Sequence, residues 1–172
     1  MSLEFKPVST DDEIALLAHM ADEIWHEYWP GMLSYAQVDY MVDAFQSIPV
    51  ITDDIREKGY EYWLLENDGR LVGYTGVLAE TDHARLFISK IYLFDSERGK
   101  GFASEVIAFL ERLCHERGLE SMYLAVNKYN DLAKRAYLAK GFVIAESVVK
   151  SIGQGFVMDD FIMVKQVDSE GR

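Results

Sequence analysis

The first third of the chain alternates apolar and polar residues at helical spacing. Apolar positions return every three or four residues up to Tyr28, and Thr10 and Glu13 ahead of them have the spacing of a capping box. Pro30-Gly31 ends this stretch, and we expect Pro49 to separate a second helix from a third. The pattern predicts a short edge strand at 3–8 and helices at 10–28, 34–45 and 52–58.

From Gly59 the apolar period changes to that of strands. Two runs rich in aromatic and branched residues flank Asn67-Asp68-Gly69, which predicts an antiparallel hairpin. Later strands alternate with two helices, the second capped by Asn130. This order predicts an α/β fold, a mixed sheet with helices on both faces. Its strands are expected at 60–66, 70–78, 86–94, 121–126, 143–151 and 156–167.

Length and composition favour one soluble domain. The 172 residues, 49% of them hydrophobic, are enough to bury a core, so we expect a single domain over residues 1–167 and a polar tail over 168–172. One cysteine, Cys114, rules out an internal disulfide and fits a reducing compartment. No signal peptide and no membrane span are expected from the apolar runs, which predicts a cytoplasmic protein without a membrane partner.

The charge is strongly negative. Seventeen basic and twenty-nine acidic residues give a formal net charge of −12, which disfavours nucleic acid as a partner. The same charge favours a cationic substrate such as an amine, although excess acid also serves solubility alone.

One glycine turn, Arg98 to Ser104, joins a strand to a helix and suggests an anion site at the helix start. A P-loop requires four residues between its glycines, whereas Gly99 and Gly101 are separated by one. A dinucleotide fingerprint requires a third glycine where Ser104 stands. An ordinary strand-to-helix turn is the remaining alternative.

The spacing of Arg98, Gly101 and Ala103 resembles motif A of the GNAT family of N-acetyltransferases. Further along, Asn127 to Ala133 and Tyr137 to Phe142 resemble the second conserved stretch of that family, in the right order. The likeness covers most of the chain, and residues 153–165 look like an ending found in bacterial polyamine-type members. The resemblance implies a mostly antiparallel GNAT-like sheet and acetyl-coenzyme A as the donor, with no metal.

The resemblance also implies the donor site. The main chain of Ile91, Tyr92 and Leu93 would pair with the pantetheine arm, and Asn127 and Asn130 would hydrogen-bond the same arm. Amides of the turn would surround the pyrophosphate, where fixed backbone dipoles suit a dianion. The implied turn residues are Arg98, Gly99, Lys100, Gly101, Phe102, Ala103 and Ser104.

By position, Tyr137 is the family's general acid for the departing thiolate. A phenol with a pKa of about 10 and a thiol with a pKa of about 8.5 are well matched for proton transfer. The alternative role for Tyr137 is packing between helix and sheet. Many relatives carry a glutamate base on the strand before the turn, but residues 85–94 contain no acid. This departure favours a water relay, with Glu27, His26 or Glu80 as candidates.

An aromatic group near the end of the first predicted helix is the candidate amine pocket. Trp25, Tyr28, Trp29 and Tyr35 offer cation–π contacts, with Ser89 nearby, but residues on a helix face equally suit a core. The leading hypothesis is acetyl transfer to a small cationic amine, such as a polyamine. A protein amino group as acceptor and a non-catalytic acyl-coenzyme A binding domain are the alternatives, and a homodimer stays open.

Overall fold

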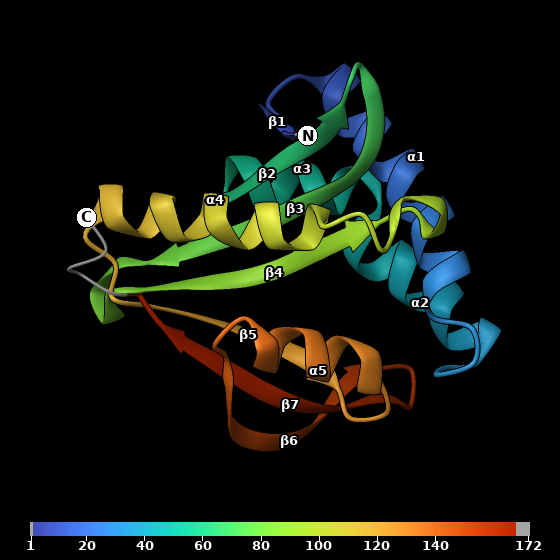
Figure 1. Ribbon diagram of the computed structural model, residues 1–172. Helices are drawn as coiled ribbons and strands as arrows, with labels where there is room; N and C mark the ends of the chain where they lie inside the picture. Colours follow the sequence, from blue (N-terminus) through green and yellow to red (C-terminus); the bar gives the residue numbers. More distant parts are fainter. Residues whose placement is uncertain (1, 168–172) are drawn as a thin grey trace. The chain divides into compact units, whose positions relative to one another are not determined.

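The computed structural model describes residues 2–167, coloured along the chain in Figure 1. The predicted polar tail, 168–172, lies outside the described residues. The helices are α1 (Asp11–Tyr28), α2 (Tyr35–Gln46), α3 (Ile48–Arg56), α4 (Phe102–Arg117) and α5 (Asp131–Ala139), with short 3₁₀ turns η1 (Thr81–His83) and η2 (Asp95–Glu97). The strands are β1 (Glu4–Pro7), β2 (Tyr60–Asn67), β3 (Arg70–Glu80), β4 (Arg85–Leu93), β5 (Ser121–Asn127), β6 (Val143–Gly153) and β7 (Phe156–Gln166).

Within residues 2–167, seven strands form one sheet in the order β1-β2-β3-β4-β5-β7-β6. Pairs β1/β2, β2/β3, β5/β7 and β6/β7 are antiparallel. β4 and β5 are parallel, and their register covers Arg85 to Phe87. The predicted mixed, mostly antiparallel sheet flanked by helices is therefore confirmed.

Contacts within the chain divide it into two compact units. Of the described residues, unit 1 contains 2–78 and 90–107, and unit 2 contains 79–89 and 108–167. That residues 1–167 form a single domain stays a prediction.

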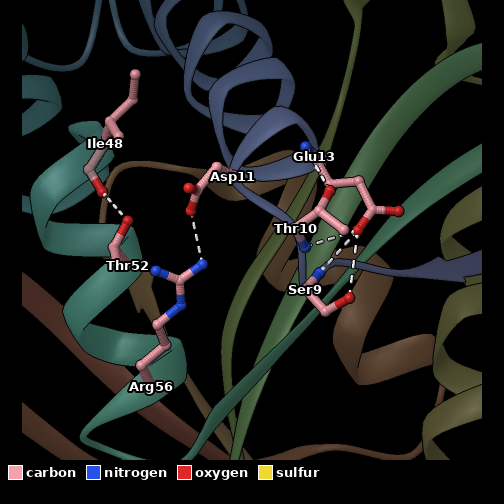
Figure 2. A network of polar contacts seen from close by, with 7 residues as sticks. All are labelled: Ser9, Thr10, Asp11, Glu13, Ile48, Thr52 and Arg56. Atoms are coloured by element: carbon pink, nitrogen blue, oxygen red, sulfur yellow. Dashed lines mark hydrogen bonds and ion pairs between the residues drawn. The ribbon is translucent and has the colours of Figure 1, made fainter.

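In unit 1, α1 begins with the predicted capping box (Figure 2). The Glu13 N–H donates to Thr10 Oγ1 at 3.1 Å, and Glu13 Oε1 accepts the N–H groups of Thr10 and Ser9 at 2.9 and 3.0 Å. These bonds satisfy N–H groups that have no partner within the helix. The N-terminal turn of α1 is thereby fixed by its own sequence.

The third helix differs from the prediction, because Pro49 belongs to it. α3 begins at Ile48, with Ser47 as its N-cap and Pro49 in its first turn. Proline is tolerated there because a first-turn N–H has no intrahelical partner. Arg56 near the end of α3 donates to Asp11 Oδ1 at 2.6 Å, which ties α3 to the start of α1 (Figure 2).

A buried hydrogen-bonded chain crosses the interior of unit 1. Trp25 Nε1 donates to the Tyr74 hydroxyl at 2.8 Å, and that hydroxyl donates to Gln46 Oε1 at 2.7 Å. Gln46 Nε2 donates to the Tyr62 hydroxyl at 3.4 Å. The chain links α1, β3, α2 and β2, and it satisfies polar groups that would otherwise be costly to bury.

In unit 2, β5 and β7 form the buried centre. Met122, Leu124 and Met163 alternate towards one face and are almost fully buried. On that face Lys165 Nζ donates to Glu111 Oε1 of α4 at 2.7 Å and to the Lys140 carbonyl after α5 at 2.6 Å. This lysine therefore helps to position α5.

Among residues 2–167, none of the helices is long and apolar enough to cross a membrane.

Candidate functional site

The glycine turn is shorter than predicted. α4 begins at Phe102, so Phe102, Ala103 and Ser104 form its first turn and the Gly101 carbonyl accepts the Glu105 N–H at 3.3 Å. Gly99 and Gly101 have φ values of 77° and 86°, a region that residues with a Cβ rarely adopt. A Cβ built on either glycine meets no atom within 4 Å. The glycines therefore serve backbone conformation, and the space in front of them is open.

The charged residues of the turn have partners within unit 1. Glu97 accepts hydrogen bonds from Arg70 at 2.9 and 3.1 Å and from Lys100 at 3.0 Å. The bond from Arg70, followed by that from Lys100, lowers the pKa of Glu97 to about 2. Arg98 donates to Asp95 Oδ1 at 3.0 Å. These side chains stabilise the turn. The groups left to bind an anion are the main-chain N–H groups at the start of α4, which have no partner within the helix.

The end of β4 is anchored on both sides of the predicted pantetheine contacts. Thr75 Oγ1 donates to the Lys90 carbonyl at 2.7 Å, and the Phe94 N–H donates to the Val72 carbonyl at 3.0 Å. The Tyr92 ring packs 5.2 Å from Trp25 and 5.5 Å from Tyr28. Ile91, Tyr92 and Leu93 therefore lie on a rigid strand that leads directly into the turn.

The aromatic residues of the candidate amine pocket differ in how far they are exposed to solvent. Trp25 and Trp29 are 2% and 6% exposed, whereas Tyr35 is 65% exposed. Trp25 is part of the core, where its indole N–H bonds to Tyr74. Trp29 Nε1 is buried without a hydrogen-bond partner among the described residues. An unpaired buried donor costs about 1–3 kcal/mol, so Trp29 presents a group that a ligand acceptor atom would satisfy.

The second motif lies in unit 2, where both asparagines order the chain before α5. Asn127 Oδ1 accepts the Tyr129 N–H at 2.9 Å, and Asn130 Oδ1 accepts the Ala133 N–H at 3.1 Å. Asn130 is thus the N-cap of α5, as predicted. Ser89, the candidate acceptor contact on β4, also belongs to unit 2.

Tyr137 is half-buried near the end of α5. Its ring meets the fully buried Phe142 edge-on at 5.5 Å, and its carbonyl accepts the Phe142 N–H at 3.0 Å. The packing fixes the ring while part of it stays accessible. This arrangement is compatible with both predicted roles, packing and proton donation.

The three candidate bases each have a partner. Glu27 Oε1 accepts the Asp95 N–H at 2.6 Å. His26 lies 2.6 Å from Asp39 Oδ1, which raises the pKa of the histidine together with the Asp22 carbonyl. Burial acts to raise the pKa of Glu80, but hydrogen bonds from Tyr123 and Arg85 outweigh it and lower that pKa. A low-pKa carboxylate is a weak base, which argues against Glu80.

Asp160 on β7 is a candidate base that the sequence interpretation missed. It lies opposite Asn127 in the β5/β7 register, and its Oδ1 is buried without a hydrogen-bond partner among the described residues. Burial, reinforced by Asp159, raises the pKa of Asp160. In the sequence, only the adjacent pair Asp159-Asp160 could have pointed to this base. Which of the two carboxylates is buried depends on how β7 pairs in the sheet, and the sequence does not give that pairing.

Lys90, half-buried beside Ile91 on β4, is a second titratable group with a shifted pKa. Burial lowers the pKa of Lys90 to about 8 against the opposing effect of Asp54, and burial also raises the pKa of Asp54. The opposite shifts are those of an acid and a base in one poorly solvated region of unit 1.

Among residues 2–167, no group of three or more His, Cys, Asp or Glu side chains is placed to hold a metal ion.

Comparison with known proteins decides the family. The profile of the Acetyltransferase (GNAT) family matches residues 19–142. The chain belongs to this family. It is 30% identical over 138 residues to the uncharacterized N-acetyltransferase Mb2688 of Mycobacterium bovis, a match covering 80% of this chain and 87% of that relative. A match to the uncharacterized N-acetyltransferase YycN of Bacillus subtilis, 30% identical over 86 residues, covers 48% of this chain and about half (55%) of the relative.

Solved structures agree on the fold. PaiA N-acetyltransferase from Thermoplasma acidophilum, in complex with coenzyme A, superposes with a TM-score of 0.78 at 18% identity, covering 96% of this chain and 99% of that one. A chimera of spermidine N-acetyltransferase SpeG from Vibrio cholerae gives a TM-score of 0.69 at 17% identity, with 96% of each chain covered. As a GNAT member, the chain is an acetyl-coenzyme A dependent N-acetyltransferase.

Proposed function

We propose that this enzyme transfers the acetyl group of acetyl-coenzyme A to a primary amine of a small cationic molecule, of the polyamine class. Support comes from the net charge of −12, which attracts cations, and from the fold shared with a spermidine N-acetyltransferase. The cytoplasmic location expected from the sequence stays a prediction.

The observation that carries the donor half is the combination of an open glycine turn with the start of a sixteen-residue helix. The main-chain N–H groups of residues 98–104 would bind the pyrophosphate, and those of residues 91–93 the pantetheine arm. The side chains of Asn127 and Asn130 would contact the same arm from the other motif. Acetyl-coenzyme A supplies the thioester, and the chain supplies fixed donors that need little ordering on binding.

The acceptor half must remove a proton. An alkylamine with a pKa of about 10.4 is almost entirely protonated at neutral pH, so a base is required. Asp160 is the base that we propose, because its unpartnered oxygen can accept a proton and its raised pKa suits that role. The neutral amine then attacks the carbonyl carbon, and the carbon–sulfur bond breaks. Tyr137 donates its proton to the departing sulfur, and the acetylated nitrogen, which carries one proton more than the amide product, returns a proton to the Tyr137 phenolate. The products are a neutral amide and a free thiol, with Tyr137 protonated again.

The amine itself would lie against the aromatic end of α1. Trp29 presents an unsatisfied N–H, so it is a stronger candidate than the core residue Trp25. Tyr28 is half-buried, but the Arg98 guanidinium already lies 4.9 Å from its ring centroid, so an amine on that face would have to displace Arg98. Ser89 stays a proposed contact on the strand. Aromatic faces bind ammonium groups by cation–π attraction, which would favour a cation over a neutral amine substrate.

Steady-state thiol release against a panel of amines tests the proposal. The panel contains di- and polyamines, a monoamine of matched length and a peptide with a free amino terminus. We expect the highest kcat/KM for a polycation. Turnover of the peptide alone would favour the protein acceptor. Calorimetric binding of acetyl-coenzyme A without turnover of any amine would favour a non-catalytic binding domain.

A further inference from the structure

The two edges of the sheet are protected very differently. β1 has four residues and ends at Pro7, and its Lys6 pairs with Glu66 at 3.1 Å. β6, at the other end of the strand order, has eleven residues. A short edge with proline and a paired charge resists association, whereas a long edge offers unpaired main-chain groups to another strand.

The β6 edge is also apolar and accessible. Val149 and Val143 are 67% and 60% exposed, and Ile144 is exposed as well. Bulges interrupt its register with β7 near Ala145 and Ile152, and the stretch from Glu146 to Ser151 between them is regular. Six consecutive residues are therefore available for regular pairing along the outer edge.

The charges of this regular stretch are symmetric about Val148. Glu146 and Lys150 each lie two residues from it, so all three side chains share one face of β6. In an antiparallel pair of two β6 strands with Val148 on the two-fold axis, Glu146 lies opposite Lys150 of the second copy. The same pairing repeats on the other side of the axis, so both charges find a partner.

We propose that β6 is the interface of a homodimer, in which two copies of this chain continue the sheet by antiparallel pairing centred on Val148. The occupant is a second copy because the edge is charge-complementary to itself. Main-chain hydrogen bonds supply the attraction, and the two Glu146–Lys150 pairs set the register. The proposal does not depend on the acceptor or the mechanism proposed above.

Charge reversal tests the register. Sedimentation equilibrium of the native chain should show concentration-dependent assembly from 19.7 kDa to twice that mass. Glu146→Lys and Lys150→Glu, made singly, place like charges opposite each other and should each raise the dimer Kd by at least about tenfold. Mixing the two variants restores opposite charges at both positions, as does the double variant, so both samples should dimerise like the native chain. Glu116→Lys, on the exposed face of α4, is the matched control and should leave dimerisation unchanged.

Hydrogen exchange on the native chain needs no substitution. Amide protection in residues 146–151 should rise with protein concentration, while protection at β1 stays constant. The proposal is overturned if the native chain remains at 19.7 kDa at every concentration. It is equally overturned if a dimer forms whose Kd is unchanged in both single charge-reversal variants, or if the amides of residues 146–151 gain no protection from exchange.

Discussion

The turn from Arg98 to Ser104 and the segment from Asn127 to Tyr137 contribute to the proposed reaction in different ways. In the turn, glycine conformation and main-chain donors matter, and the charged side chains are paired with Asp95 and Glu97. In the second segment, the asparagine oxygens order the main chain, and the Tyr137 side chain is the one that we propose to transfer a proton. Binding of the donor is thus assigned mainly to backbone, and proton transfer to side chains.

This difference predicts that substitutions in the two regions affect separate measurements. Backbone strain in the turn should change donor affinity with little effect on the chemical step. Loss of a proton-transferring side chain should change kcat and leave donor affinity intact.

The largest effect is expected for Tyr137→Phe. Removing the proposed general acid should lower kcat by about a hundredfold or more, with the calorimetric Kd of acetyl-coenzyme A unchanged. Tyr129→Phe is the matched control, because Tyr129 is 72% exposed in the same segment and should keep native kinetics. Equal activity of the two variants would assign Tyr137 to packing.

Asp160→Asn should come next, lowering kcat/KM for the amine by about ten- to a hundredfold at neutral pH. The ionised fraction of Asp160 falls as pH falls through its pKa. Because that pKa is raised, the native rate should begin to decline at a pH above the ordinary carboxyl value. The variant should lose this acid limb of the pH–rate profile. Asp159→Asn, whose carboxylate pairs with Lys128, is the control and should retain the limb, displaced to lower pH because Asp159 helps to raise the pKa of Asp160.

Gly101→Ala should weaken donor binding by about tenfold. A side chain at φ 86° costs about 1–2 kcal/mol, and the turn can relieve that strain only by leaving its binding conformation. Gly118→Ala, at φ 70° after α4, introduces similar strain with equally open space around the Cβ. It should lower the melting temperature without changing the calorimetric Kd. If both variants bound acetyl-coenzyme A with similar affinity, the glycine turn would not be part of the donor site.

Glu97→Gln should reduce the free energy of unfolding by about 1 kcal/mol at pH 7, after allowing for the solvent exposure of Arg70 and Lys100. The folded-state pKa of Glu97, about 2, lies below its ordinary value of 4.5. Its contribution is therefore complete above pH 4.5 and is lost as pH falls towards 2. Denaturant unfolding should show the native chain and the variant converging over that window. A constant difference would contradict the assignment.

Lys100→Ala should give the smallest change, no more than about a twofold loss of donor affinity, because its ammonium group is bound to Glu97 at 3.0 Å. Calorimetry measures this directly. A loss of tenfold or more would show that Lys100 contacts the donor, and the turn would then act through side chains as well.

The sequence predicted those features that depend on neighbouring residues. The Thr10–Glu13 capping box, the hairpin between β2 and β3 and the Asn130 cap all follow from local chemistry, and the structure confirms them. The prediction that Pro49 separates two helices is wrong, because a proline between two helices and one in a first turn look alike in sequence.

Long-range burial could not be predicted in the same way. The unpaired Trp29 indole and Asp160 carboxylate depend on what the tertiary structure places around them. The exposure of β6 depends on its position at the end of the strand order, which no local pattern gives. The roles of the individual donor-site residues stay predictions.

One competition reaction tests the central claim most directly. The native enzyme is incubated with acetyl-coenzyme A and equal amounts of a polyamine, a monoamine of matched length and a peptide with a free amino terminus. Mass spectrometry then quantifies each acetylated product. We expect the acetylated polyamine to form fastest and Tyr137→Phe to slow its formation. Acetylation of the peptide alone, or of no amine while acetyl-coenzyme A still binds, would contradict it.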